Sequence, residues 1–303
     1  MRVLVLGSAA GGGLPQWNCG CDNCNAARAG KLLPRTQDSL ALSADGEHWV
    51  LLNTSPDVRQ QLAASTALHP RRLRDSPLTA VVLTNADVDH SLGLFVLREG
   101  SALSIHGTGV MLDALRRHDA LCRTLERSPE QTRWTALDPE RPQPLLGARG
   151  EPTGLSLEAV PVPGKLPPHW VGLVAPDPAH NVGLLVRDER GDSSVGYAPC
   201  VAHDAPGVRR ILREARLAFF DGTFWSDDEL VALGAGQRRA ADMAHWPLSG
   251  ALGSLEFLRR EARGRSVLTH VNNTNPILRD GPERAAVLDA GLLVAHDGMD
   301  LSS

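Results

Sequence analysis

Three cysteines lie within six residues near the start of the chain, in the order Cys19, Cys21 and Cys24. Thiolates at this C-x-C-x-x-C spacing can converge on one tetrahedral metal ion, and zinc is the usual guest. The other two cysteines, Cys122 and Cys200, lie far away in the sequence, which argues against a disulfide framework. We therefore predict a metal-binding, cysteine-rich segment at residues 17–24, with partly buried free thiols as the alternative.

The composition sets limits on partners and compartment. Hydrophobic residues make up 42% of the 303 residues, enough for a sizeable core, and the net charge of −4 argues against a nucleic-acid-binding surface. No apolar run approaches the ~20 residues of a membrane span, and the short apolar stretch after Arg2 runs at once into glycines, unlike a secretory signal. We expect a cytoplasmic protein with no membrane insertion and no nucleic-acid partner.

Strand and helix patterns alternate along most of the chain. Strands at 2–6, 39–42 and 48–53 come first, the last two joined by a turn at Asp45-Gly46. Further strands are predicted at 79–83, 103–106, 155–162, 182–186, 194–197, 217–220, 266–268 and 291–295, and helices at 58–68, 92–99, 110–125, 208–216, 250–260 and 283–290. The stretch 127–153 reads as irregular. This order predicts one α/β domain, residues 1–303, in which two sheets share a core and carry helices outside.

A dense group of charged side chains follows the predicted strand 79–83. Asp87, Asp89 and His90 place two carboxylates and an imidazole within four residues, at the kind of strand end where α/β proteins position their sites. Gathering these groups costs free energy unless a cation or water offsets it. The alternative is a helix N-cap with a solvated histidine.

Polar residues also follow other predicted strands. Cys200 follows strand 194–197, Asp221 follows strand 217–220, His270 follows strand 266–268, and His245 precedes a helix. A single histidine in such a place is more often structural than a ligand. Together, however, these positions are what one metal site between two sheets would require.

Several longer stretches resemble a known family. They are Leu6–Gly13, Pro15–Cys19, Ser55–Asp57, Asp89–His90, Asn181–Leu184, Tyr197–Pro199, Asp221–Thr223 and His270–Leu278. Through them the chain resembles the metallo-β-lactamase superfamily and, within it, the proteins of pyrroloquinoline quinone (PQQ) synthesis. The resemblance covers nearly the whole chain. It implies a metallo-β-lactamase-like αββα four-layer sandwich with a metal site at one edge.

The resemblance also implies a reduced ligand set. The superfamily motif H-x-H-x-D-H reads Asn85-x-Asp87-x-Asp89-His90 here, so two imidazoles are missing, while the last histidine of the superfamily site is kept as His270. A further imidazole is replaced by Pro163, and the bridging carboxylate by Cys200. A dizinc hydrolase needs more ligands than remain.

What remains is one carboxylate and two imidazoles, from Asp89, His90 and His270. This is the ligand inventory of non-haem Fe(II) oxygenases. We predict Fe2+ at this site, ahead of Zn2+ or Mn2+.

The cysteine-rich segment matches relatives that carry a structural zinc. In these relatives a histidine three positions beyond the last active-site histidine completes the tetrahedron, and here that position is Asn273. We predict a structural Zn2+ bound by Cys19, Cys21, Cys24 and Asn273, with water or another side chain as the alternative fourth ligand.

The family implies an oxygenase step in PQQ biosynthesis, in which the Tyr-derived ring of a peptide-derived Glu–Tyr precursor is hydroxylated. His245 and Asp87 are candidate ligands or proton shuttles, and Lys165 is grouped with them as a candidate catalytic residue that can also meet a substrate carboxylate. The candidate substrate-binding residues are Arg98, His169 and Asn272.

Two other functions stay open. The chain could be a non-catalytic binder or carrier of PQQ or its precursor, since degenerate enzymes often persist as binders. A metallohydrolase or phosphodiesterase is less favoured because of the missing ligands. The precursor, a small or dipeptide-like molecule, is the expected partner, and a homodimer is a candidate assembly.

Overall fold

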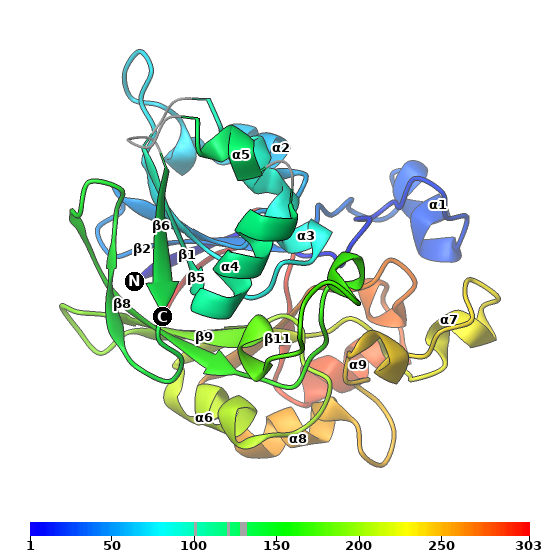
Figure 1. Ribbon diagram of the computed structural model, residues 1–303. Helices are drawn as coiled ribbons and strands as arrows, with labels where there is room; N and C mark the ends of the chain where they lie inside the picture. The colour runs from blue at the N-terminus through cyan, green and yellow to red at the C-terminus, as the bar shows by residue number, and fades with distance from the viewer. Residues whose placement is uncertain (100–101, 120–121, 128–131) are drawn as a thin grey trace.

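Two sheets face each other across an apolar core in the computed structural model, which describes residues 1–99, 102–119, 122–127 and 132–303 (Figure 1). Within these residues each sheet has seven strands. The first has the order β14 (Asp300–Ser302), β1 (Arg2–Gly7), β2 (Ser39–Ser43), β3 (Trp49–Leu52), β4 (Leu78–Val82), β5 (Leu103–Thr108) and β6 (Thr132–Leu137). The second has the order β13 (Leu293–Val294), β12 (Arg265–Thr269), β11 (Leu217–Asp221), β10 (Ser194–Ala198), β9 (Val182–Asp188), β8 (Pro152–Pro161) and β7 (Gln143–Leu146).

Each sheet is antiparallel in one half and parallel in the other. Strands β14, β1, β2 and β3 pair antiparallel, and β3 to β6 pair parallel. In the second sheet β7 to β10 are antiparallel, and β10 to β13 are parallel. Because parallel strands end at the same edge of a sheet, the loops after β10, β11 and β12 emerge side by side.

Helices cover the outer faces of both sheets. Figure 1 shows α2 and α5 above the strands, α4 beside β5, and α6 and α8 below the strands, with α1 and α7 projecting to the right. The helices are α1 (Asp22–Arg28), α2 (Val58–Ala64), α3 (Val88–Ser91), α4 (Gly109–His118), α5 (Cys122–Leu125), α6 (Pro206–Glu214), α7 (Glu229–Ala232), α8 (Ser254–Glu261) and α9 (Pro282–Asp289). This is the four-layer αββα sandwich that the resemblance implied.

The strands are apolar on both sides because both sides are buried. In β1, Val3 and Val5 lie in the core between the sheets, whereas Leu4 and Leu6 pack toward the helices on the outer face. A strand covered on both faces has no need for alternating polar residues. The helices also pack closely on the outer faces. A Cβ at Gly196 in β10 would lie 2.7 Å from the side chain of Ile211 in α6, so glycine allows α6 to approach the sheet.

Several expectations about secondary structure need correction. The stretch 127–153, predicted to be irregular, contains β6 and β7. Pairing with neighbouring strands makes these segments strands despite their polar, proline-containing sequence. Residues 128–131 of this stretch lie outside the described part. The predicted helix 110–125 is two helices, α4 and α5, and residues 120–121 between them are likewise not described. The strand β14 and the helices α1, α3 and α7 were not predicted, and the predicted helix 92–99 is a 3₁₀ turn at Leu92–Phe95 that follows α3. None of the described helices combines the length and apolarity that a membrane crossing demands.

Candidate metal centre and active-site cavity

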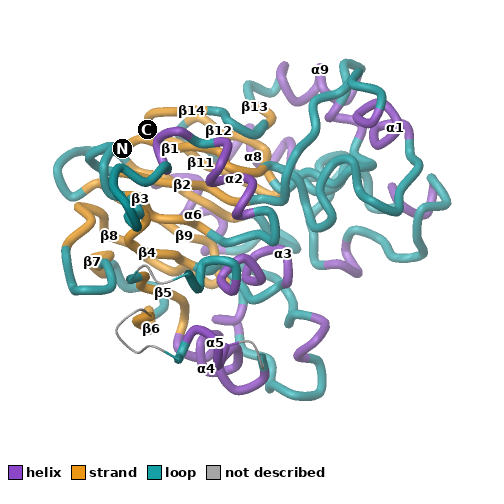
Figure 2. Tube along the Cα trace, turned by 90° about the horizontal axis from the view of Figure 1, so that it is seen from above, coloured by secondary structure: helices purple, strands orange, loops and turns teal. Residues whose placement is uncertain are grey.

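The loops that follow β4, β10, β11 and β12 meet at one edge of the two sheets, where α3 lies (Figure 2). Asp89 and His90 are part of α3, and His270 directly follows β12. The structure therefore brings the three predicted ligands together from two sheets. We call these three residues the Asp–His–His triad.

Two donor-atom distances in the Asp–His–His triad, both from Asp89, are short. Oδ2 of Asp89 lies 3.2 Å from Nε2 of His270 and 3.7 Å from Nε2 of His90. The two imidazole rings meet edge to face, with 5.2 Å between their centroids. An ion bound to carboxylate oxygen and imidazole nitrogen at about 2.0–2.2 Å would hold such atoms about 3–3.5 Å apart. The Asp89–His270 distance falls in this range, and the Asp89–His90 distance exceeds it by about 0.2 Å, so the donor types and their spacing suit a metal ion after a small side-chain adjustment.

The Nδ1 atoms of the two triad histidines contact threonine hydroxyl groups. Nδ1 of His270 lies 2.8 Å from the hydroxyl of Thr223, and Nδ1 of His90 lies 3.3 Å from the hydroxyl of Thr84. Contacts of this kind fix the tautomer and orientation of metal-binding histidines. They leave both Nε2 atoms for the ion.

His245 lies beside the triad and is oriented by Asp221. Its Nδ1 lies 2.7 Å from Oδ2 of Asp221, and its ring stacks on His270 with 5.3 Å between centroids. The buried Asp221 carboxylate also accepts hydrogen bonds from the backbone of Val201 and from the backbone and hydroxyl of Thr223. Asp221 is therefore fully used in positioning these groups, and the free ring nitrogen of His245 is Nε2.

The backbone around His90 is fastened to the loop after β3. The amide of Thr54 donates to the His90 carbonyl at 2.7 Å, and the amide of Gly93 donates to the Thr54 carbonyl at 3.0 Å. A Cβ at Gly93 would lie 2.3 Å from the carbonyl oxygen of Ser55. Only glycine fits this approach, so the sequence itself brings α3 close to the sheet.

His270 adopts a backbone conformation that is rare for a side-chain-bearing residue. Its φ is 55°, and its carbonyl oxygen lies 2.9 Å from the hydroxyl oxygen of Thr223. The next amide, that of Val271, donates to the carbonyl of Ser8 at 2.9 Å. Strain of this kind persists only where surrounding contacts enforce it, and it is common at functional sites.

The protonation of the triad follows from burial and mutual charge. Burial lowers the pKa of His90 to about 4, so this ring is neutral at pH 7. Burial alone would also lower the pKa of His270, but its hydrogen bond and attraction to Asp89 raise it to about 9. Burial opposes ionisation of Asp89 too, yet the two histidines hold its pKa well below its usual range. The Asp89 carboxylate is thus ionised and pairs with a protonated His270, and a metal ion would have to replace the proton on Nε2 of His270.

A cavity of about 250 Å³, the active-site cavity, opens beside the triad. All three candidate catalytic residues, Asp87, Lys165 and His245, line it, and so does Asn272. Phe224 and Met243 give it an apolar wall. Arg238 and Cys200 also line the cavity.

Two predicted substrate-binding residues, Arg98 and His169, do not line this cavity. Arg98 donates to the carbonyl of Phe95 at 2.8 Å and pairs with Glu99 at 3.3 Å. His169 is exposed to solvent, although the next residue, Trp170, is fully buried. Burial of the tryptophan turns its neighbour toward solvent.

The carboxyl of Asp87 faces the cavity and has no hydrogen-bond or ion-pair partner among the described residues. Burial and the negative charge of Asp89 raise its pKa to about 6, although the charge of Lys165 partly opposes this. A group with this pKa can exchange a proton near neutral pH.

The cysteine cluster, Cys19, Cys21 and Cys24, gathers a second set of ligands. The three sulfur atoms lie within 4.8 Å of one another. Nδ2 of Asn273 lies 3.1 Å from Sγ of Cys19, 3.3 Å from Sγ of Cys24 and 3.6 Å from Sγ of Cys21. A tetrahedral zinc with Zn–S bonds of about 2.3 Å would place its sulfurs about 3.8 Å apart, so the set fits zinc. Asn273 would bind through Oδ1, which requires its amide to turn over.

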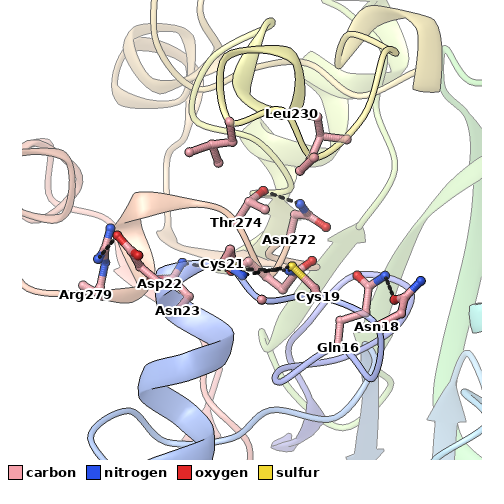
Figure 3. A pocket seen from close by; sticks show the side chains of 14 residues that line it. Gln16, Asn18, Cys19, Cys21, Asp22, Asn23, Leu230, Asn272, Thr274 and Arg279 are labelled. Carbon is pink, nitrogen blue, oxygen red and sulfur yellow. Dashed lines mark hydrogen bonds and ion pairs between the residues drawn. The ribbon is translucent and has the colours of Figure 1, made fainter.

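The cysteine cluster and the triad share one loop. Nδ2 of Asn23 in α1 donates to the carbonyls of Asn273 and Asn275, both at 2.9 Å, and so attaches α1 to the segment after His270. A cavity of about 570 Å³ lies between the cluster and Leu230. Figure 3 shows Asn272 on its wall, hydrogen-bonded to Thr274. Asn272 lines both cavities.

Some residues of the site were not predicted as such. Asp221 was noted only as a polar residue after a strand, and Thr223 only as part of a stretch that resembles the family. Their closeness to His245 and His270 is visible only in three dimensions. Thr84, the residue before the motif that begins at Asn85, was not singled out. Arg238 gave no signal, because an exposed arginine in a loop is ordinary.

Comparison with known proteins covers almost the entire chain. Residues 48–271 match the family model described as a beta-lactamase superfamily domain. The coenzyme PQQ synthesis protein B of Methylobacterium radiotolerans is 43% identical over all of both chains, and that of Cupriavidus necator is 44% identical over 99% of each. The crystal structure of Zn2+-bound PqqB from Methylobacterium extorquens superimposes with a TM-score of 0.90 at 38% identity, covering 99% of each chain.

Proposed function

The chain belongs to the family of coenzyme PQQ synthesis protein B within the beta-lactamase superfamily, and we propose that it performs a metal- and O2-dependent hydroxylation in PQQ biosynthesis. The substrate of this proposal is a peptide-derived Glu–Tyr precursor whose Tyr-derived ring gains oxygen. Identity above 40% over full length to relatives named for PQQ synthesis supports the pathway. The hydroxylation itself is supported by the chemistry of the cavity.

The observation that carries the proposal is the convergence of the Asp–His–His triad on an open cavity. One carboxylate and two imidazoles suit Fe2+ and leave positions free. A bound Fe2+ would supply the activation of O2. The cysteine cluster, with its soft thiolate donors, suits a structural Zn2+ instead. A Zn2+-bound relative of 38% identity supports metal binding by the family.

The other cavity residues have roles that follow from their chemistry. Lys165 and Arg238 bind carboxylates of the precursor through charge-assisted hydrogen bonds. Phe224 and Met243 form the apolar wall against which the aromatic ring packs. His245, oriented through Nδ1 by Asp221, accepts the ring proton at Nε2.

Asp87 exchanges that proton with solvent, since its carboxyl is free and its pKa is raised to about 6. Each hydroxylation breaks one ring C–H bond and forms one C–O bond with an oxygen atom of O2. The other oxygen atom leaves as water, with two electrons and two protons from a reductant in solution. The assay therefore has to contain a reductant such as ascorbate.

The test is anaerobic loading with Fe2+, followed by precursor, ascorbate and 18O2. We expect oxygen uptake and a product that is heavier by one labelled oxygen atom per turnover. His270→Ala should abolish both signals. His203→Ala removes an exposed imidazole outside the cavity and should leave them unchanged. Absence of labelled product with the intact protein would contradict the proposal.

A non-catalytic carrier is the second candidate. It is favoured by the pair of cations, Lys165 and Arg238, which can hold an anionic precursor with or without a metal. Tight precursor binding that survives removal of iron, with no oxygen uptake, would support the carrier.

A metallohydrolase fits less well. A bridging carboxylate is lacking, because Cys200 occupies its position, and Asp221 is already saturated with hydrogen bonds. Turnover of a generic phosphodiester with Mn2+, lost in His90→Ala, would be the result in its favour.

A further inference from the structure

We propose that Cys200 is a fourth protein ligand of the active-site metal, which makes its donor set one carboxylate, two imidazoles and one thiolate. The inference rests on the metal site of the proposed function. Sγ of Cys200 lies 3.9 Å from Nε2 of His90, and ligand atoms of Cys200, His90 and His270 all lie within 4.8 Å of one another. The thiol faces the active-site cavity, as does Asp89.

The spacing is close to what one ion requires. An ion with a bond of about 2.3 Å to sulfur and about 2.0–2.1 Å to nitrogen, at a tetrahedral angle, separates these donors by about 3.6 Å. The observed 3.9 Å between Cys200 and His90 differs from this by a few tenths of an ångström. A small side-chain rotation closes that difference.

The backbone holds the thiol in this place. Cys200 follows β10 after Pro199, and its carbonyl accepts a hydrogen bond from Nδ2 of Asn181 at 3.1 Å. The next amide, that of Val201, donates to Asp221 at 2.9 Å. In the described part of the chain His90 is the one hydrogen-bond partner of Sγ. The sulfur is thus presented to the triad without being used elsewhere.

A small buried residue that merely fills space is the competing explanation, and Cys122 is an example of it. Cys122 is fully buried in α5 among Leu115, Leu125 and other apolar side chains of the outer core. Cys200 differs because its surroundings are two imidazoles and a carboxylate. Thiol next to imidazole is a ligand environment rather than an apolar one.

A thiolate would change what the site prefers and what it can do. Soft sulfur raises affinity for zinc and iron relative to manganese. Four protein ligands also leave a six-coordinate iron with two open positions instead of three. The thiol proton passes to solvent when the bond to the metal forms.

Iron K-edge X-ray absorption tests the inference, because it sees the iron site and ignores zinc in the cysteine cluster. The full chain is purified with zinc in the cluster and loaded anaerobically with Fe2+. We expect sulfur in the first shell of iron at about 2.3 Å, a bond length like that of zinc thiolates. Cys200→Ser and Cys200→Ala should both lose this sulfur and bind iron at least about tenfold more weakly. The control Cys122→Ala should keep the sulfur.

The outcomes separate the inference from the proposed function. Iron that binds in a His270-dependent way without sulfur in its shell overturns the role of Cys200 and leaves the Asp–His–His site intact. Iron that binds equally well to His270→Ala, or not at all, overturns both. The zinc K-edge of the same samples should report three sulfurs in every Cys200 variant, which verifies that the cluster and the fold persist.

Discussion

The cysteine cluster and the Asp–His–His triad both gather metal-binding atoms, but they are assembled in opposite ways. The three cysteines lie within six residues of chain, and α1 is the short helix that carries the last of them. The triad joins residues up to 181 positions apart, and the chain segments after β4 and β12 place them without an ion. A metal bound by the cluster would therefore supply folding energy to a local segment, whereas the triad is built by the sheets.

The largest expected effect concerns the triad and should be chemical rather than structural. His270→Ala removes one of two imidazoles, so hydroxylation should fall at least about 1,000-fold, about 4 kcal/mol of transition-state stabilisation. Because the strands stay packed, the free energy of unfolding should change by no more than about 1 kcal/mol. Steady-state oxygen uptake and urea unfolding measure the two quantities. If His270→Ala lowered the unfolding free energy by as much as it lowers transition-state stabilisation, the division into a chemical triad and a structural cluster would be contradicted.

The next effect concerns the cysteine cluster and should be the reverse. Cys21→Ser removes one thiolate, and we expect zinc loss and a fall in unfolding free energy of about 3–4 kcal/mol. Limited proteolysis should cut first near α1. Fe2+ affinity of the triad should change much less than stability.

The control for the cluster is Asn18→Ser, an exposed residue in the same loop whose side chain contacts Gln16. It should keep its zinc and its stability. Equal loss of iron and of zinc in Cys21→Ser would mean that the two sites form one unit.

Glu229 offers a way to sharpen the comparison, because it braces the loop that both sites share. Its carboxylate accepts from the hydroxyl of Thr274 at 2.5 Å and from the amide of Trp225 at 2.7 Å. Burial raises its pKa to about 7, above the ordinary 4.5, so the folded chain binds a proton that the unfolded chain releases between these values. Stability from this group is therefore full below pH 4.5 and is lost as pH rises toward 7.

Glu229→Gln mimics the protonated acid and removes this dependence. Relative to the unmodified chain, the variant should gain about 2–3 kcal/mol of unfolding free energy between pH 5 and pH 8. Urea unfolding of both proteins across this range measures the difference. A difference that stays constant with pH would show that the Glu229 carboxyl is ionised over the whole range from pH 5 to pH 8. Its contacts with Thr274 and Trp225 would then be ordinary charged hydrogen bonds.

The cluster was predictable because its spacing is local, and the triad because strand ends converge. The two sheets and most strands follow from apolar runs that are buried on both faces, as in β1. What escaped prediction depends on loop paths. Lys165 turns into the cavity while His169 turns out, because Trp170 between the loop and the core is fully buried.

Orientation also escaped prediction. Nothing in the spacing of Asp221 and His245, 24 residues apart, indicates that the carboxylate fixes the ring. The edge strands β6 and β7 were missed for a related reason: their pairing partners, not their own side chains, make them strands. Local sequence predicts strands that are buried on both faces far better than edge strands or side chains whose orientation depends on a distant residue.

The smallest expected effect concerns Arg238, which distinguishes the cavity from the rest of the surface. It lines the active-site cavity, and no hydrogen bond or ion pair to its side chain occurs among the described residues. Arg238→Gln should raise KM for an anionic precursor about 5–10-fold, about 1 kcal/mol, with kcat nearly unchanged, because the cation binds substrate and transition state alike. The neighbouring Arg239 pairs with Asp227 at 3.2 Å outside the cavity, so Arg239→Gln is the matched control and should leave KM as it was. Equal effects of both variants would mean that general surface charge, rather than the cavity, attracts the precursor.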